Sequence, residues 1–184
     1  MPIPSHISEM KTKPTQQAIR TLNEAGIFPD FVLCRATRPL DDVRKKKIET
    51  YANIPSDRII SAPDIKTIYE IPLNFEKERL GKKILERFGL QPRKVPDWNW
   101  WNKFVARIEN PSSRITIAIV GKYVDIGDYA LADSYISINQ ALEHAGAAAD
   151  VGVDIKWVDS KIFEKDRSKM QELKNYSGII IPGG

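Results

Sequence analysis

The stretch Ile115-Thr116-Ile117-Ala118-Ile119-Val120-Gly121 is almost continuously apolar. A strand with apolar side chains on both faces is typical of a parallel sheet that is covered on both sides. Downstream, the pattern predicts a helix from about 133 to 145, a strand at 154–159, a helix near 161–174 and a strand at 178–181. This order is a βαβαβ run. Right-handed crossovers place the carboxyl ends of its strands along one edge, where ligands bind in open α/β sheets.

The first part of the chain also alternates helix and strand, which is typical of an α/β fold. The expected elements are a helix at 15–25, a strand at 30–35, a helix at 41–51, a strand at 58–61 and helical segments over 67–88 interrupted at Pro72. Between residues 89 and 114 the pattern gives way to prolines and tryptophans. This change predicts a linker with a short docking helix near 97–109.

The charge of the chain does not by itself favour nucleic acid as a partner. The net charge is +4, and residues 1–110 carry 20 Lys and Arg against 14 Asp and Glu, so the basicity belongs to the first part. The basic side chains alternate with acidic ones, which is typical of solvated helix surfaces. Stacking of Trp98, Trp100 and Trp101 on single-stranded nucleic acid is an alternative, but we interpret them as pinning the linker to a domain.

Cys34 is the one cysteine of the sequence and lies in an apolar run, so we expect a buried thiol and a reducing compartment. No apolar stretch is long enough for a signal peptide or a membrane span, and we expect a cytoplasmic protein. His6 and His144 show no metal-binding spacing, and we expect His144 near the end of its helix, before Gly146.

The segment Lys11-Thr12-Lys13-Pro14-Thr15-Gln16 places two lysines around a hydroxyl, directly before apolar residues at helical spacing. Pro14 suits a first helical turn, and Thr12 or Thr15 can cap the free backbone amides there. The positive end of a helix with two lysines beside it can hold a polyphosphate. The alternative is a solvated basic turn before an ordinary helix.

The segment Pro182-Gly183-Gly184 follows a predicted strand. Its backbone amides can point at a developing oxyanion, as acyl transfer requires. A glycine turn without any function would have the same sequence. No G-x-G-x-x-G or G-x-x-x-x-G-K-[ST] motif occurs in the 184 residues. No G-x-S-x-G nucleophile elbow occurs either, and Cys34 follows no strand-to-helix elbow, so we assign no catalytic residue and no metal ligand.

Taken together, these segments resemble the CTP synthases, glutamine-dependent enzymes that make CTP from UTP. The resemblance runs in order over nearly the whole chain, through residues 9–16, 26–30, 34–35, 47–48, 60–64, 68–72, 121–123, 133–135 and 182–184. It implies an α/β chain in three parts. Residues 1–90 would be the end of an incomplete P-loop-like, dethiobiotin-synthetase-like amidoligase domain, 91–113 a linker, and 114–184 the first βαβαβ portion of a class I glutamine amidotransferase domain.

The resemblance also implies ligands and site residues. The segment that grips UTP or inhibitory CTP would comprise Lys11, Thr12, Lys13, Pro14, Thr15 and Gln16, with Lys47 as a further cation. Pro63, Asp64 and Ile65 would lie against the adenine of ATP, and Gly184 would be the oxyanion glycine beside glutamine. ATP with Mg²⁺, activation by GTP and a homotetramer follow from the family, with neither a membrane nor nucleic acid as partner.

Some family features are expected outside this sequence. The phosphate loop and the magnesium carboxylates would precede Lys11, where Ser8 replaces a usual glycine, and the nucleophilic cysteine would follow Gly184. We therefore expect a chain truncated at both ends that is inactive alone. The alternative is a non-catalytic nucleotide-binding or interface module that associates with a full-length synthase.

Overall fold

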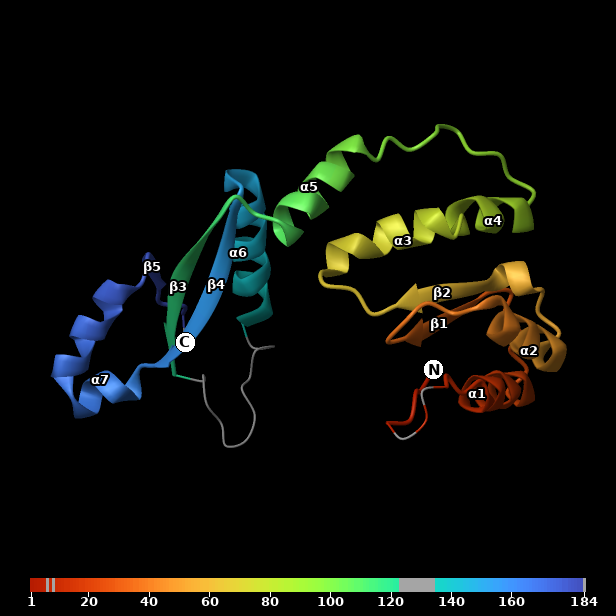
Figure 1. Cartoon of the computed structure of the whole chain (residues 1–184), viewed down its shortest axis with the longest axis horizontal. Helices are drawn as coiled ribbons and strands as arrows, with labels where there is room; N and C mark the ends of the chain where they lie inside the picture. Colours follow the sequence, from red (N-terminus) through yellow and green to blue (C-terminus); the bar gives the residue numbers. More distant parts are fainter. Residues whose placement is uncertain (6, 8, 123–134, 184) are drawn as a thin grey trace. The chain divides into compact units, whose positions relative to one another are not determined.

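The computed structural model describes residues 1–5, 7, 9–122 and 135–183. It divides into two compact units, Met1–Trp98 and Asn99–Gly184. Both contain parallel strands and helices, which confirms the α/β class (Figure 1). Their assignment to an amidoligase domain, a linker and an amidotransferase domain stays a prediction. Among the described residues, no helix has the length and apolar character needed to cross a membrane.

The first unit is built on a parallel strand pair. The strands β1 (Val32–Ala36) and β2 (Ile59–Pro63) pair in register from Val32 with Ile59 to Ala36 with Pro63. The helices are α1 (Lys13–Glu24), α2 (Asp42–Ala52), α3 (Ile71–Lys77) and α4 (Leu80–Arg87), and the 3-10 turns are η1 (Ser56–Arg58) and η2 (Ile68–Glu70). Figure 1 shows α1 and α2 on one side of the strands and α3 and α4 on the other. The parallel pairing directs both strand ends toward one edge.

Apolar side chains from α2 and the strands form the core of this unit. Ile48, Ile59 and Ile60 are fully buried, and Met10 and Ile19 bring the segment before α1 and α1 itself into the same cluster. The expectation of a buried Cys34 is confirmed, and burial raises the pKa of its thiol.

The helical region after β2 is interrupted at a different residue from the predicted one. Pro72 lies in the first turn of α3, where its missing amide costs no helical hydrogen bond. The break falls at Arg79, which has a left-handed backbone with φ of 54° between α3 and α4. The prediction of an interruption at Pro72 was therefore wrong, because a proline disrupts a helix interior and not its start.

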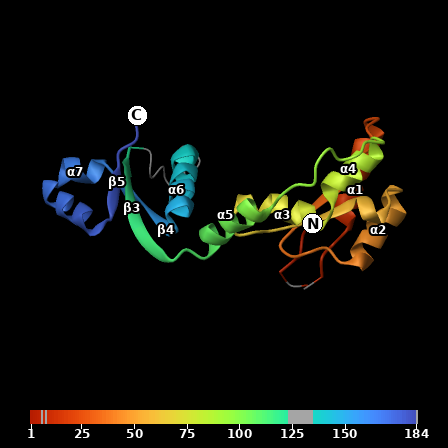
Figure 2. The same ribbon diagram turned by 90° about the horizontal axis from the view of Figure 1, so that it is seen from above.

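The second unit contains a parallel sheet in the order β4-β3-β5, formed by β3 (Ser113–Gly121), β4 (Val151–Asp159) and β5 (Gly178–Ile180). The predicted βαβαβ run is confirmed. Figures 1 and 2 show α6 (Ile136–Ala149) and α7 (Lys161–Lys165) on opposite sides of this sheet. The single helix expected near 161–174 is instead α7 followed by η4 (Arg167–Asn175), because Asp166 leaves the helical conformation and its carboxylate accepts from the amide of Ser168.

The helix α5 (Asn99–Glu109) packs against α6 within this unit through aromatic side chains. Phe104 contacts the ring of His144 at 5.9 Å between centroids, and Trp100 stacks on Phe104 at 5.5 Å. Two-thirds of the surface of Trp100 is nevertheless exposed. His144 is therefore an aromatic packing partner and not the helix-terminal group that we expected.

The predicted end of α6 near Gly146 was wrong by about one turn, since the helix continues to Ala149 and stops at left-handed Asp150. Gly146 is buried within α6, and a Cβ added there would lie 2.5 Å from the carbonyl oxygen of Val151. The glycine is required by the close approach of β4, not by a helix end.

We expect Gly146→Ala to lower the free energy of unfolding of the second unit by about 1–3 kcal/mol, because the backbone of β4 must move away. The matched control is Gly81→Ala in α4, where an added Cβ meets nothing within 4 Å. That change should be neutral or stabilise the first unit by up to about 1 kcal/mol. Urea unfolding followed by circular dichroism measures both, and an unchanged midpoint for Gly146→Ala would contradict the packing argument.

Candidate nucleotide-binding site

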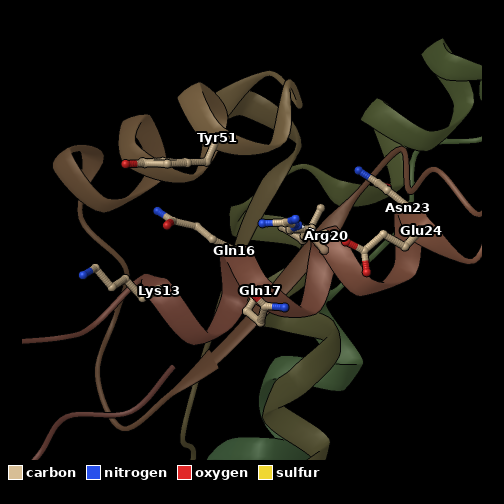
Figure 3. Close-up of a pocket in the computed structure, with 8 residues that line it drawn as sticks. Lys13, Gln16, Gln17, Arg20, Asn23, Glu24 and Tyr51 are labelled. Carbon is tan, nitrogen blue, oxygen red and sulfur yellow. Dashed lines mark hydrogen bonds and ion pairs between the residues drawn. The ribbon is translucent and has the colours of Figure 1, made fainter.

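A pocket of about 610 Å³ lies along α1 and the end of α2. Its volume is in the range of pockets that hold small-molecule ligands. The lining residues are mostly polar or charged and come from α1, with one aromatic residue from α2: Lys13, Gln16, Gln17, Ile19, Arg20, Asn23, Glu24 and Tyr51. Figure 3 shows the Gln16 amide pointing toward the side on which the Tyr51 ring lies. The pocket thus combines two cations, a carboxylate, amides and an aromatic face.

The structure divides the predicted UTP segment between two faces of α1. Lys13 and Gln16 line the 610 Å³ pocket. Pro14 and Thr15 line a separate, largely apolar groove of about 440 Å³ beside β1. Because successive helical residues differ by about 100° in direction, a contiguous motif cannot present all its side chains to one ligand.

Thr12 does not have the expected capping role. It is buried and already helical, with φ of −87° and ψ of −22°, and its side chain makes no capping hydrogen bond. Its hydroxyl instead accepts a hydrogen bond from the Gln16 amide nitrogen at 3.2 Å. A threonine caps a helix when its own backbone is extended, so the capping prediction for Thr12 was wrong. This bond fixes the orientation of the Gln16 side chain at the pocket.

Lys11 lies in a cluster of charges and not in the pocket. Its ammonium is 2.7 Å from a carboxylate oxygen of Glu9, whose other oxygen is 3.3 Å from Arg44 at the start of α2. The hydrogen bond and charge of Lys11, with smaller contributions from Arg44 and Lys47, lower the pKa of Glu9. The carboxylate form of Glu9 is therefore favoured beside Lys11, a residue of the predicted UTP-binding segment.

A second pocket, of about 420 Å³, opens where β2 ends. The three predicted ATP residues, Pro63, Asp64 and Ile65, all line it, together with Arg35, Lys66, Ile68, Ile71, Asn74 and Phe75. The Arg35 guanidinium is 3.1 Å from the Asp64 carboxylate. The Asp64 amide donates to the carbonyl oxygen of Ala36 at 2.8 Å, which fixes the turn after β2. This pocket lies at the carboxyl ends of parallel strands, the usual place for a ligand in such sheets.

The predicted oxyanion residue, Gly184, lies outside the described residues. At the carboxyl end of β3, the Gly121 carbonyl oxygen accepts from the Ser160 amide at 3.0 Å. Within the described residues, no group of three or more His, Cys, Asp and Glu side chains is arranged to hold a metal ion. We therefore assign no magnesium ligand and no metal-dependent step to the described residues.

The sequence analysis predicted two of the eight residues that line the 610 Å³ pocket and missed six: Gln17, Ile19, Arg20, Asn23, Glu24 and Tyr51. The signal available for Arg20 was its spacing, since it lies one helical turn beyond Gln16 and two beyond Lys13. The side-chain oxygen of Asn23, Oδ1, is buried and has no hydrogen-bond donor among the described residues. The sequence alone cannot reveal this. Tyr51 reaches the pocket only through the packing of α2 beside α1.

Comparisons with known proteins point to one family. Residues 1–90 match the family model described as CTP synthase N-terminus. The chain is 45% identical to the CTP synthase of Methanopyrus kandleri over 100% of this chain and 34% of that protein. It is 42% identical to the CTP synthases of Methanocaldococcus jannaschii and Azospirillum brasilense over 96% of this chain and 32% and 31% of those proteins. The chain spans about a third of the length of the curated relatives it matches.

We expect Lys11→Ala to raise the pKa of Glu9 toward its ordinary value, because Lys11 is the main cause of its depression. The Glu9–Lys11 ion pair is fully formed when the pH is above the ordinary glutamate pKa. It is lost as the pH falls through the lowered pKa of Glu9. Carbon-13 NMR titration of the Glu9 carboxyl measures the shift. Lys47→Ala is the control and should raise this pKa less, since Lys47 contributes least; an equal rise would contradict the geometry.

Proposed function

We propose that this chain, which is homologous to CTP synthases over its whole length, supplies nucleotide-binding surfaces for the ATP-dependent amination of UTP to CTP with glutamine as nitrogen donor. The observation that carries the proposal is the 610 Å³ pocket, because it contains two residues of the predicted UTP motif, Lys13 and Gln16. Tyr51, the aromatic residue of this pocket, was not part of that motif. Its ring adds a face on which a nucleobase can stack.

Five of the eight side chains that line this pocket can contribute to binding a pyrimidine triphosphate, and Glu24 pairs with one of the five, Arg20, at 3.0 Å. The ammonium of Lys13 and the guanidinium of Arg20 neutralise phosphate charge. The amides of Gln16 and Asn23 can donate to and accept from the polar edge of a pyrimidine. The Tyr51 ring offers a face against which the base can stack. The same surface would take CTP as an inhibitor, since the two nucleotides share their triphosphate and ring size.

The 420 Å³ pocket supports the proposed ATP site. Ile68, Ile71 and Phe75 give it an apolar wall that suits a purine ring. The exposed Arg35–Asp64 pair lies at the same pocket and can hydrogen-bond to polar atoms of a base. Phosphoryl transfer to the uracil oxygen also needs a phosphate cradle and Mg²⁺, which this chain's described residues do not supply.

Glutamine, ammonia transfer, activation by GTP and assembly into a tetramer belong to the same proposal. Residues 114–184, which make up most of the second unit, would be the start of the glutamine amidotransferase domain, and the cytoplasm would be the compartment. The parallel order β4-β3-β5 supports this assignment, since its strand ends converge on one edge.

We expect UTP and CTP to bind the chain, and Lys13→Ala and Tyr51→Ala each to raise the dissociation constant by about 5- to 20-fold, as the loss of a charge-assisted bond or a stacked ring implies. Isothermal titration calorimetry measures this. Tyr51→Phe keeps the ring and should bind nearly as wild type, and Lys169→Ala in the second unit is the charge control. Wild-type affinity in both alanine variants would refute the assignment of the pocket.

We expect the 184-residue chain alone to form no CTP from UTP, ATP, Mg²⁺ and glutamine, because its sequence contains no phosphate loop and no assigned nucleophile. Chromatographic detection of CTP in a steady-state assay tests this. Turnover that scales with the concentration of the chain would contradict it.

A further inference from the structure

The Glu9 carboxylate lies between two cations that belong to different elements. Its oxygens are 2.7 Å from the Lys11 ammonium, just before α1, and 3.3 Å from the Arg44 guanidinium in α2. Lys47, one turn further along α2, also acts on its charge. Glu9 therefore places its own negative charge against Lys11, a residue of the predicted UTP-binding segment.

Stability does not account for this arrangement. The side chains of Lys11 and Glu9 are 40% and 43% exposed. Exposed ion pairs of this kind add little to stability, because water competes for both partners. Such a pair breaks easily, and a polyphosphate with several negative charges competes strongly for the ammonium.

Arg44 offers a second position for the same carboxylate. Its side chain is 20% exposed and is held by Asp41, with 2.6 Å between Nη1 and Oδ2. Its Nε is buried and has no hydrogen-bond partner among the described residues. The Nε and Nη2 atoms form one edge of the guanidinium fork, and Glu9 now uses only Nη2. A small rotation lets the carboxylate leave Lys11 and take both nitrogens of this edge, which satisfies the free Nε.

We propose that Glu9 is a positioning residue that exchanges partners: it holds Lys11 in the nucleotide-free chain and moves fully onto Arg44 when a polyphosphate takes the ammonium. This inference rests on the proposed function, to which it adds Lys11, a residue of the predicted UTP segment that does not line the 610 Å³ pocket. Arg44 keeps the carboxylate neutralised after the exchange, so the ligand does not face a free negative charge. Glu9 thereby sets the affinity and favours ligands with several phosphates over ligands with one.

The exchange predicts opposite effects for its two members. Glu9→Gln frees Lys11 in advance and should tighten the binding of UTP and of inorganic tripolyphosphate by about 3- to 10-fold, with a smaller effect on UMP. Arg44→Lys keeps the charge but removes the fork, so Glu9 stays on Lys11 and binding should weaken by a similar factor. In a chain that already carries Glu9→Gln, adding Arg44→Lys should not change the affinity further. The Glu9 carboxylate that Arg44 would otherwise take over is absent there.

Isothermal titration calorimetry with UTP, UMP and tripolyphosphate on the full 184-residue chain tests the cycle. Glu172→Gln is the matched control, since Glu172 also lies 2.7 Å from an exposed lysine, and it should bind as wild type. Unfolding midpoints should be nearly equal for all variants, and NMR of the Lys11 ammonium should show a shift on adding tripolyphosphate that Glu9→Gln reproduces in part without ligand.

Three results overturn the inference. If wild type binds and Glu9→Gln binds equally or more weakly, the exchange is wrong while the proposed function stands. If Arg44→Lys weakens binding by the same factor with and without Glu9, Arg44 does not receive the carboxylate. If wild type binds neither UTP nor tripolyphosphate, both the exchange and the proposed nucleotide site fail together.

Discussion

The packing of α2 against the β1–β2 pair is the constraint on which the first unit depends. Ile48 of α2 and Ile59 of β2 are fully buried, and each contributes about 1.5–3 kcal/mol by leaving water. Once Ile48 faces the strands, the helical repeat decides where its neighbours lie. Tyr51, three residues further on, comes to the side of α1, and Lys47 comes to the side of Glu9.

The same helix, α2, therefore contributes to the pocket along α1, to the charge cluster around Glu9 and to an ion pair with the end of α3. Through Tyr51, α2 completes the pocket along α1. Through Arg44 it meets Glu9, and through Lys45 it pairs with Glu78, at 3.1 Å and with both side chains largely buried. Glu78 ends α3, the helix whose Asn74 and Phe75 line the second pocket. A displacement of α2 would therefore change the shape of both pockets, because packed elements shift together.

The errors of the sequence predictions share one cause, which is that a residue type has several uses. Pro72 starts a helix and Gly146 lies inside one, although both residue types commonly mark ends. Thr12 bonds to Gln16 and not to the backbone amides. In each case the role of the residue depends on a contact with another part of the chain or on a backbone angle. The local sequence pattern specifies neither of these.

The sequence by itself determined the alternation of helix and strand, the parallel character of the apolar strand at 115–121, and the segments that match CTP synthases, because these depend on side-chain periodicity and residue identity. Only the tertiary structure decided which of those residues share a surface. It placed Lys13 and Gln16 in a pocket with Tyr51, turned Pro14 and Thr15 to another face, and brought Glu9 to Arg44. The physical reason is that a helix directs neighbouring residues apart, while packing brings together residues that are distant along the chain.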